Sequence, residues 1–304
     1  MPYSMIVLAK QVPDTKQVTG EAMKEDGTVN RAALPAIFNP EDLNALELAL
    51  RIKERHGGQV TLITMGPPGA AEILREGLYR GADRVILLTD RRAAVSDTLA
   101  TSYILSCAVR AVGDYDLVIC GRQAIDGDTA QVPPQTAEKL GLTQITYLVA
   151  LECLEGRTIR VRRLIADGYE VVEATLPVLL TVVGTANEPR PPSVKRVMRF
   201  KNARAPSEIA REVKELDPGI TAEDLGARVA ERAQALKRRD ALITEWTLDD
   251  VGADIALCGR KGSPTQVNRI QYIVLTASGF KRIEPTDEGV TGLVHELIED
   301  HTIG

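Results

Sequence analysis

The residues of this sequence best suited to ligand chemistry lie in one short stretch, Asp126 to Val132, which reads DGDTAQV. It follows an uninterrupted apolar run, Leu117 to Cys120, and precedes a pair of prolines at 133–134. Prolines are tolerated in the first turn of a helix, where the N–H groups have no intrahelical partner. A turn between a buried strand and a helix offers backbone amides to an anion, Gly127 allows close approach, and Thr129 adds a hydroxyl. The stretch is therefore a candidate site for the phosphate groups of a ligand.

The same residues also fit an ordinary capped turn, with Asp128 or Thr129 as the N-cap of the helix. A single glycine-containing turn is a weak motif, and both interpretations remain open at this point. Two aspartates would repel a phosphate group. We therefore expect Asp126 and Asp128 to contact ribose hydroxyls, helix ends or backbone amides instead.

Other kinds of chemistry find little support in the sequence. The four cysteines and three histidines are scattered, without a CxxC pair or a metal-ligand cluster, so we predict no metal site. The motifs of phosphate loops, dinucleotide fingerprints, serine elbows and zinc proteases are missing as well. One further turn, Gly259 to Thr265, combines two glycines, two cations and two hydroxyls. It is a second candidate anion site, although a solvated turn is the favoured interpretation.

The composition indicates a globular protein with neither a nucleic-acid surface nor a membrane span. Hydrophobic residues make up 44% and charged residues 26% of the 304 residues, and the formal net charge is -5. No basic stripe compensates for that charge, and no apolar run reaches the length of a membrane span. The first residues, MPYSMIVLAK, lack the features of a signal peptide, so we expect a cytoplasmic protein.

Strands and helices alternate through the first half of the chain. Apolar runs predict buried strands at Met5 to Ala9, Val60 to Met65, Arg84 to Leu88 and Leu117 to Cys120. Helices are predicted from Asn39-Pro40 to Gly57, from the turn at 66–69 to Arg80, and from Asp97 to Val112. This alternation predicts the α/β class, with a doubly wound, mostly parallel sheet. Ligands of such sheets bind beyond the carboxyl ends of the strands, which is where the DGDTAQV turn is expected.

The second half follows another pattern. Strands at 146–152, 158–164, 169–174 and 178–183 follow one another with short turns, which predicts antiparallel hairpins, one of them completing the main sheet. Three prolines within Asn187 to Pro192 predict an extended, largely exposed loop. Residues 205–240 form a predicted helical hairpin that must cover its apolar faces, with its own domain slightly favoured over another chain. A last amphipathic helix, 289–300, ends the chain. We therefore predict a nucleotide-binding domain at 1–192 and an arm with the hairpin at 193–304.

The organising stretch is also recognisable as a family pattern. GRQAIDGDTAQVPPQTAEKL, from Gly121 to Leu140, resembles the hallmark segment of electron transfer flavoprotein β-subunits. Further matches are VLAKQVPDT, FNPED, GADRV, RRLIADGYEVVEATLPVLLTV and NEPR, so that the resemblance covers nearly the whole chain. The chain departs from the family pattern at Ala166, where an acid is usual, at Pro133, where glycine is usual, and in the hairpin at 205–240.

The resemblance implies a Rossmann-like domain that pairs with an α-subunit carrying one FAD. In one branch of the family the β-subunit holds AMP as a structural ligand. In the electron-bifurcating branch it holds a second FAD, which NADH reduces. One electron then goes to ferredoxin or flavodoxin, and the other goes through the α-subunit to an acyl-CoA dehydrogenase or quinone reductase. Such a β-subunit is active within its complex rather than alone.

The small residues Gly127, Thr129 and Ala130 resemble the bifurcating branch, and so does GRKGSPT at 259–265. The resemblance implies that Asp126 to Val132 hold pyrophosphate and ribose, that Ala9 and Met65 meet the adenine, and that Asn39 and Gly66 lie near the ribose and phosphates. The full set of expected binding residues is Ala9, Asn39, Met65, Gly66, Ala124, Asp126, Gly127, Asp128, Thr129, Ala130, Gln131 and Val132.

The exposed NEPR loop, with Val194 as an apolar anchor, is expected to meet the partner dehydrogenase. Two rivals remain. One is the AMP-holding carrier of the same family, without NADH chemistry. The other is a stand-alone nucleotide-binding regulator of the universal-stress type, which shares the sheet but lacks the long tail.

Overall fold

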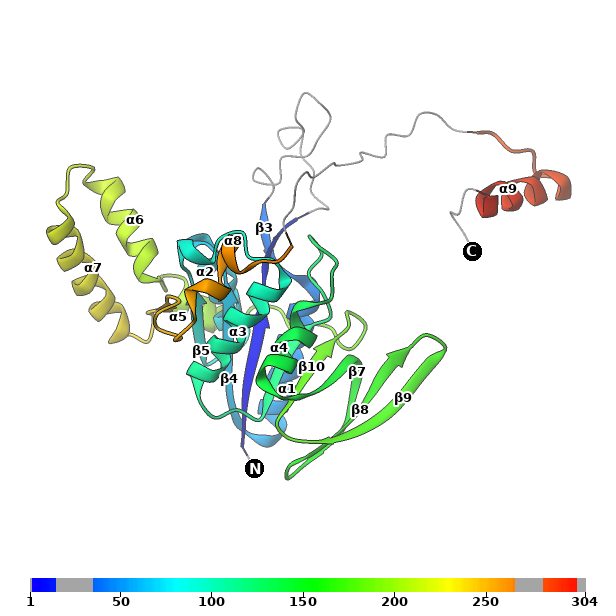
Figure 1. Cartoon of the computed structure of the whole chain (residues 1–304), viewed down its shortest axis with the longest axis horizontal. Helices are drawn as coiled ribbons and strands as arrows, with labels where there is room; N and C mark the ends of the chain where they lie inside the picture. The colour runs from blue at the N-terminus through cyan, green and yellow to red at the C-terminus, as the bar shows by residue number, and fades with distance from the viewer. Residues whose placement is uncertain (1, 15–34, 266–280, 300–304) are drawn as a thin grey trace.

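The computed structural model describes residues 2–14, 35–265 and 281–299, and its centre is a nine-stranded sheet (Figure 1). The strand order is β11-β5-β4-β1-β6-β10-β7-β8-β9. The first four strands along the chain that join this sheet are β1 (Tyr3–Ala9), β4 (Gly58–Met65), β5 (Arg84–Leu88) and β6 (Leu117–Gly121). All of them are parallel to their neighbours.

The order of these strands creates a topological switch point between β1 and β6. From β1 the chain moves outward to β4 and β5, and it then returns to the other side of β1 to form β6. In open α/β sheets, ligands bind in the crevice where the strand order reverses. A ligand site is therefore expected at the carboxyl ends of β1 and β6.

Helices cover both faces of the sheet, which confirms the doubly wound α/β class. One face carries α1 (Pro40–His56) and α2 (Ala71–Arg80), whereas the other carries α3 (Thr98–Val112) and α4 (Val132–Leu140). Successive residues of β1 point to opposite faces, as the period of a strand requires. Accordingly, Met5 and Val7 belong to the core under α1 and α2, and Ile6 and Leu8 belong to the core under α3 and α4.

The later strands correct one expectation from the sequence. Strands β7 (Thr143–Glu155), β8 (Thr158–Ile165) and β9 (Gly168–Thr175) are antiparallel to one another, as predicted. However, β10 (Val178–Val182) lies between β6 and β7 and pairs in parallel with both. Each residue of β10 is buried, so it is a central strand rather than one arm of a hairpin. Buried central strands of this kind are typical of parallel sheets.

Residues 187–190 are less exposed than the prolines of this segment suggested. The side chains of Asn44 and Asn187 bind each other's backbone carbonyls at 2.7 and 3.0 Å. In addition, Arg190 forms an ion pair with buried Glu47 at 2.7 Å. These contacts attach the segment to α1, and the prediction of a largely exposed loop is wrong for these two side chains. The segment leads into α5 (Val194–Phe200), where Val194 is 78% and Met198 61% exposed.

The helical hairpin consists of α6 (Pro206–Leu216) and α7 (Ala222–Lys237). The start of α6 packs on the main body, because Ile209 and Val213 are buried and Arg75 pairs with Glu208 at 2.8 Å. At the far end of α6, by contrast, Leu216 is 82% exposed. The helix α7 has no buried residue and lies against α6 (Figure 1). The hairpin is therefore attached through one end only.

Part of the C-terminal segment joins the main body. The edge strand β11 (Thr244–Trp246) pairs in parallel with β5, and a division of the chain near residue 192 stays a prediction. The remaining short elements are β2 (Gln11–Pro13), β3 (Ala36–Phe38), η3 (Pro68–Ala70), η4 (Arg91–Ala93), η5 (Ile255–Leu257) and α8 (Gly259–Gly262). The last helix is α9 (Asp287–Glu299), and the part of the expected arm at 266–280 lies outside the described residues.

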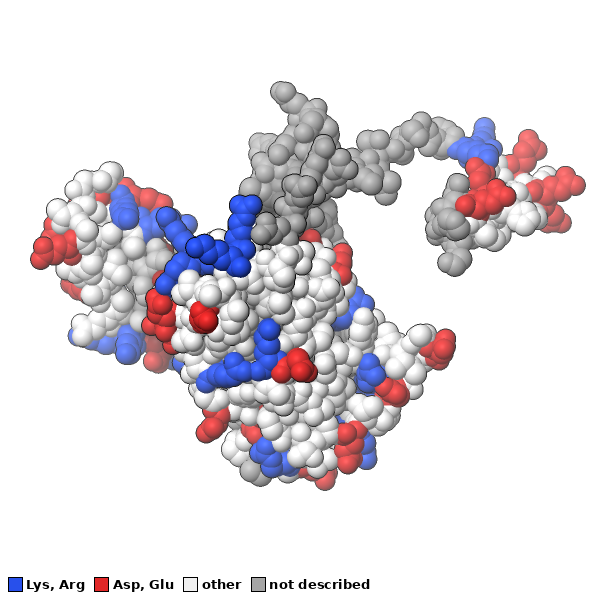
Figure 2. Space-filling view, in the orientation of Figure 1, with Lys and Arg blue, Asp and Glu red and all other residues white. Residues whose placement is uncertain are grey.

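Surface charge is mixed on the face shown in Figure 2, where basic and acidic side chains surround a largely uncharged area. Among the described helices, none combines the length and the hydropathy that crossing a lipid bilayer requires.

Candidate functional site

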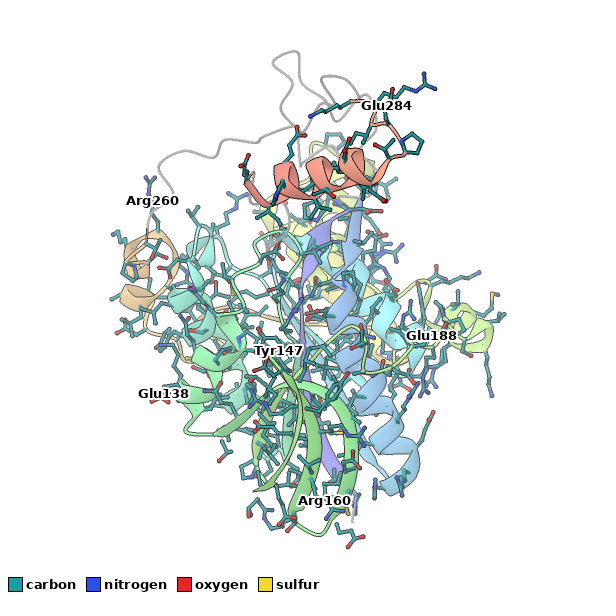
Figure 3. The ribbon with its side chains drawn as sticks, turned by 90° about the vertical axis from the view of Figure 1, so that its right-hand side faces the viewer. Glu138, Tyr147, Arg160, Glu188, Arg260 and Glu284 are labelled. Atoms are coloured by element: carbon teal, nitrogen blue, oxygen red, sulfur yellow. The ribbon has the colours of Figure 1, made fainter. Side chains whose placement is uncertain are left out.

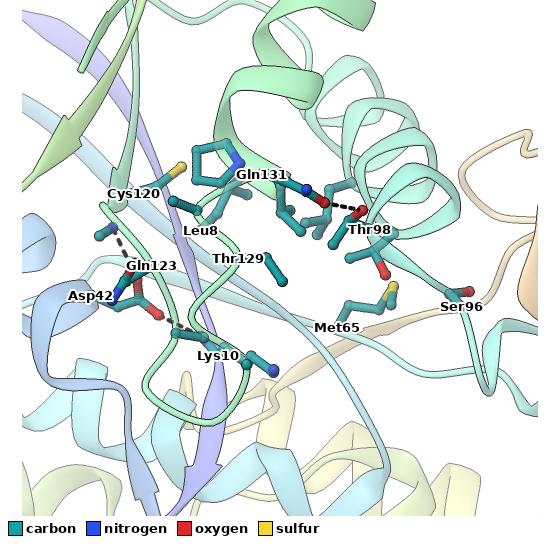
Figure 4. A pocket seen from close by; sticks show the side chains of 18 of the residues that line it. Leu8, Lys10, Asp42, Met65, Ser96, Thr98, Cys120, Gln123, Thr129 and Gln131 are labelled. Carbon is teal, nitrogen blue, oxygen red and sulfur yellow. Dashed lines mark hydrogen bonds between the residues drawn. The ribbon is translucent and has the colours of Figure 1, made fainter. Parts of the chain in front are cut away.

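A cavity of about 570 Å³ lies at the carboxyl ends of β1, β4 and β6, next to the switch point (Figure 4). The strand ends contribute Ala9, Met65 and Gly121 to its lining. One wall, residues 93–98, is the loop before α3 with the first residue of that helix. The other, residues 123–133, is the loop before α4 with the first two residues of that helix. A cavity of this size suits a small-molecule ligand or cofactor.

Buried Asp42 joins the strands at the base of the cavity. Its carboxylate accepts hydrogen bonds from the amides of Lys10, at 2.8 Å, and Gly121, at 2.9 Å. Those amides lie where β1 and β6 end, so one side chain of α1 fixes the spacing of both strand ends. Burial raises the pKa of Asp42 to about 7, although the two amide hydrogen bonds lower it.

The loop that follows β6 is held in place by Asn39. This residue precedes α1 as its N-cap, but its side chain does not cap the helix. Instead, it donates to the carbonyl of Gln123 at 2.9 Å and accepts from the amide of Ile125 at 3.1 Å. Asn39 is fully buried and is not part of the cavity lining. In this structure it positions the loop.

Both aspartates of the DGDTAQV turn have partners within the protein. Asp126 pairs with Lys10 at 2.7 Å, and Asp128 accepts a hydrogen bond from Gln123 at 2.9 Å. Neither Asp128 nor Thr129 caps α4, because the N-cap is Gln131 and no side chain caps the helix. The capped-turn alternative is therefore wrong in the residues it named. The two carboxylates are therefore engaged by Lys10 and Gln123.

The turn leaves several donors open beside the cavity. Among the hydrogen bonds of the described residues, none is donated by the amides of Thr129, Ala130, Gln131 or Val132. The first N–H groups of a helix lack intrahelical acceptors, and the helix dipole favours an anion there. Because the next two residues are prolines, these four amides are the donors available at this end of α4. The arrangement suits a phosphate or pyrophosphate group.

The opposite wall is polar without being a second anion site. Asp97 caps α3 by accepting from the amide of Ala100 at 2.9 Å, so this helix start already has its own negative charge. Burial raises the pKa of Asp97, but the backbone hydrogen bonds from Ala100 and Thr265 leave it below its usual range. Hydroxyls of Ser96, Thr98 and Thr101 line this wall, and Thr98 donates to Gln131 across the cavity at 2.8 Å. Such hydroxyls suit sugar or ring polar atoms.

The structure gathers nine of the twelve expected binding residues around this cavity: Ala9, Met65, Ala124, Gly127, Asp128, Thr129, Ala130, Gln131 and Val132. Asn39, Gly66 and Asp126 lie outside the lining. Gly66 donates to the carbonyl of Leu88 at 3.1 Å, and the other two support the loop as described. The sequence analysis missed Ser96, Thr98 and Thr101. The signal was present, since an Asp N-cap after a buried strand marks a helix that starts at the ligand edge of the sheet.

Within the described part of the chain, no group of three or more His, Cys, Asp or Glu side chains is arranged to hold a metal ion. The four cysteines are free, and burial raises the pKa of the Cys120 thiol beside the cavity. The described groups that the site offers to a ligand are therefore backbone N–H donors, hydroxyls and the ends of the strands.

The mostly parallel sheet, its switch point and the helices on both faces define a doubly wound protein of the α/β class. Comparison with known sequences narrows the class further. The electron transfer flavoprotein domain family matches residues 26–216, more than half of the chain. The chain belongs to the electron transfer flavoprotein family, as a full-length homologue of its β-subunits.

Three relatives illustrate the match. The electron transfer flavoprotein subunit beta of Clostridium acetobutylicum is 39% identical over 300 residues, covering 99% of this chain and 100% of the relative. The caffeyl-CoA reductase-Etf complex subunit CarD of Acetobacterium woodii is 38% identical over 302 residues, covering 98% and 99%. The protein FixA of Azorhizobium caulinodans is 40% identical over 273 residues, covering 88% and 83%.

Proposed function

We propose that this chain is the β-subunit of an electron-bifurcating electron transfer flavoprotein and that it holds FAD in the cavity at the switch point. NADH is the electron donor of the proposed complex, which passes electrons to a ferredoxin or flavodoxin and to an acyl-CoA dehydrogenase or quinone reductase. The chain works within a heterodimer with an α-subunit in the cytoplasm. The match to the family over the whole length disfavours the stand-alone regulator.

The observation that carries this proposal is the combination of free amides and small side chains in one turn. Thr129 to Val132 present their N–H groups beside the cavity, and a Cβ added at Gly127 would meet no atom within 4 Å. In the proposal these amides hold the diphosphate. The hydroxyls of Ser96, Thr98 and Thr101 contact ribityl or ring polar atoms, and Ala9 and Met65 meet the adenine.

When bound, the flavin supplies the hydride and single-electron chemistry, which no side chain of the cavity provides. The protein contributes position and electrostatics. Asp42 fixes the strand ends below the ligand, and Asn39 holds the loop that carries the amides. The pairing of Asp126 with Lys10 offsets one negative charge near the diphosphate. These contacts keep the donors oriented before the ligand arrives, which lowers the entropic cost of binding.

The partner contacts of the proposal use the second half of the chain. Val194 and Met198 expose apolar side chains on α5, which follows the segment that the Glu47–Arg190 pair attaches to α1. We assign this surface to the partner dehydrogenase, and the name of CarD, a subunit of a reductase-Etf complex, supports a partner of this kind. Helix α9 exposes Val290, Val294 and Ile298. We assign this apolar face to the α-subunit, because an unpaired amphipathic helix gains stability by docking.

The second candidate is the carrier that holds AMP instead of FAD. It uses the same turn for a single phosphate and has no NADH chemistry. The open amides serve either ligand. The small residues at positions 127, 129 and 130 favour the larger one, because they leave the wall next to the amides without bulky side chains.

Flavin content distinguishes the two candidates. The copurified heterodimer is denatured, and released FAD and AMP are quantified by absorbance and chromatography. Two FAD per heterodimer, together with NADH reduction of both, is the result expected from our proposal. One FAD with one AMP would establish the carrier instead, and a chain that purifies without a partner or flavin would overturn both.

A further inference from the structure

The residues 259–265, which read GRKGSPT, do not form a free turn in the structure. Gly259, Cys258 and Ser263 are buried, and the segment carrying α8 lies against the loop before α3 (Figures 1 and 4). That loop, residues 93–98, is one wall of the cavity. The segment itself contributes no residue to the lining. The interpretation of GRKGSPT as a solvated turn is therefore wrong for its buried residues, whereas an anion site there stays a prediction.

Three hydrogen bonds and one longer polar contact connect the segment to the wall. The amide of Gly259 donates to the Ser96 hydroxyl at 3.0 Å, and the amide of Asp97 donates to the Ser263 hydroxyl at 2.8 Å. The amide of Thr265 donates to the second carboxylate oxygen of Asp97 at 2.9 Å. Finally, Ser263 lies 3.5 Å from the carbonyl of Val95. Two consecutive residues of the wall, Ser96 and Asp97, are thus bound by residues about 165 positions later.

The close fit at Gly259 shows how tightly the two segments pack. Its φ is +59°, and an added Cβ would lie 2.1 Å from the carbonyl oxygen of Arg92. Ser263 closes the segment on itself by donating to the Gly259 carbonyl at 2.7 Å. An ion pair between Arg92 and Asp249, at 2.6 Å, fixes the same loop from a neighbouring part of the chain. The wall is thus held by a segment that contributes no residue to the cavity lining.

The wall needs such external support because its own backbone is strained. Val95 has a φ of 63°, which is unfavourable for a β-branched residue, and its side chain is 76% exposed. Strained loops persist only where the surroundings hold them. Loss of the contacts from 259–265 would let the wall relax, and Ser96 and Thr98 would move away from the ligand position.

We propose that the segment Gly259–Thr265 is a positioning element for nucleotide binding, with Ser263 as its central residue. It fixes the position of the wall that faces the open amides of α4. In this way it raises the affinity for the nucleotide without touching it. This inference rests on the proposed nucleotide site. It adds a determinant of affinity from a part of the chain outside that site. In Figure 3, Arg260 of this segment and Glu188 of the proposed partner-binding side lie on opposite sides of the molecule, so that the two roles can be tested separately.

The test uses the copurified full-length heterodimer, stripped of the ligand of this subunit, with FAD and AMP as the probes. Ser263→Ala removes the acceptor of the Asp97 amide, and Gly259→Ala forces the two segments apart. Their matched controls are Ser106→Ala and Gly219→Ala. Ser106 is a buried hydroxyl of α3 that donates to Tyr103 outside the cavity, and a Cβ added at Gly219 would meet no atom within 4 Å.

The dissociation constant of the bound probe is expected to rise about tenfold in Ser263→Ala and further in Gly259→Ala, since a buried amide loses its acceptor. Both controls stay within about twofold of the wild type, and Ser263→Thr, which keeps the hydroxyl, restores most of the affinity. The thermal midpoint of the ligand-free protein should fall no more in Ser263→Ala than in Ser106→Ala.

Three outcomes would overturn the inference. Wild-type affinity in both Ser263→Ala and Gly259→Ala would do so while leaving the proposed function intact. An equal loss of affinity in Ser106→Ala would show that the loss in Ser263→Ala comes from general destabilisation of the protein. A wild-type protein that takes up neither FAD nor AMP would remove the proposed function and this inference together.

Discussion

The Oδ1 atom of Asp42 lies 2.9 Å from the amide nitrogen of Gly121, and a Cβ at position 121 would lie 2.5 Å from the same oxygen. It would also lie 2.7 Å from the backbone of Glu41. The start of α1 therefore approaches the end of β6 so closely that glycine alone fits. This approach forms the base of the cavity, so a small change at either residue should alter the site.

Gly121→Ala is expected to push α1 away from β6 and to weaken both the fold and the site. Because the clash involves backbone and a buried carboxylate, the free energy of unfolding should fall by about 1–3 kcal/mol. Urea unfolding gives this value, and the flavin content of the purified heterodimer reports the site. Gly113→Ala tests backbone strain alone, because Gly113 has a positive φ and a Cβ added there would meet no atom within 4 Å. A Gly121→Ala protein with wild-type stability and flavin would contradict the close approach.

The buried carboxyl group of Asp42 should make stability depend on pH. Its pKa rises from 3.8 in the unfolded chain to about 7 in the folded protein, so the folded state binds the extra proton. Its stabilising contribution is complete below pH 3.8 and is lost as the pH rises through about 7. Across this window the free energy of unfolding should fall by about 1.4 kcal/mol per pH unit from this group alone.

Asp42→Asn isolates that contribution, since it removes the titrating group. Urea midpoints of the wild type and the variant are compared from about pH 5 to about pH 8, which spans the raised pKa. The advantage of the wild type over Asp42→Asn should shrink as the pH rises towards about 7 and then stay constant. A difference that is the same at every pH would count against a raised pKa.

Gly127→Asp tests the diphosphate site directly. The new carboxylate would stand beside the free amides of the turn and repel the negatively charged ligand. We expect this subunit to lose most of its FAD, while the flavin of the α-subunit stays. Flavin per heterodimer is the measurement, and Gly219→Asp, in the turn of the helical hairpin, is the control with the same added charge. Undiminished second-flavin content in Gly127→Asp would mean that the site is misplaced.

Arg190→Ala should destabilise the chain through Glu47. Glu47 is only 4% exposed at its side chain, and Arg190 gives it a 2.7 Å ion pair that holds its pKa below the usual range against the effect of burial. Removing one partner of such a pair leaves a buried charge and costs about 3–5 kcal/mol. The second partner, Arg51, is half exposed, so Arg51→Ala should cost less.

The two arginine variants are compared by thermal and urea unfolding. Glu47 has a lowered pKa, so its contribution is present above its ordinary pKa of 4.5 and is lost at lower pH. The gap between wild type and Arg190→Ala should therefore narrow in acid. Equal losses of stability in Arg190→Ala and Arg51→Ala would show that Arg190 stabilises Glu47 no more than the half-exposed Arg51 does. A lower affinity for the dehydrogenase in Arg190→Ala alone would support the role of this segment in docking.

Local patterns in the amino-acid sequence were enough to find eight of the nine strands of the sheet, all except β11, and the position of the turn. Arg84–Leu88 was predicted at its observed bounds, and the helix predicted from Asp97 has Asp97 as its N-cap. Apolar runs, N-cap residues and glycines act over a few neighbouring positions, so a short window suffices to find them. Because the carboxyl ends of parallel strands share one edge, the same patterns also placed the DGDTAQV turn at the ligand side.

The roles of the side chains around that turn became visible only in the folded chain. Asn39 reads locally as a helix cap, yet it binds a loop 84 and 86 positions later. The strand β10 reads as a hairpin arm, yet it enters the sheet between β6 and β7. GRKGSPT reads as a turn, yet it supports the wall at 95–97. Each role depends on which distant segments the sheet brings together, and no local pattern of residues contains that information.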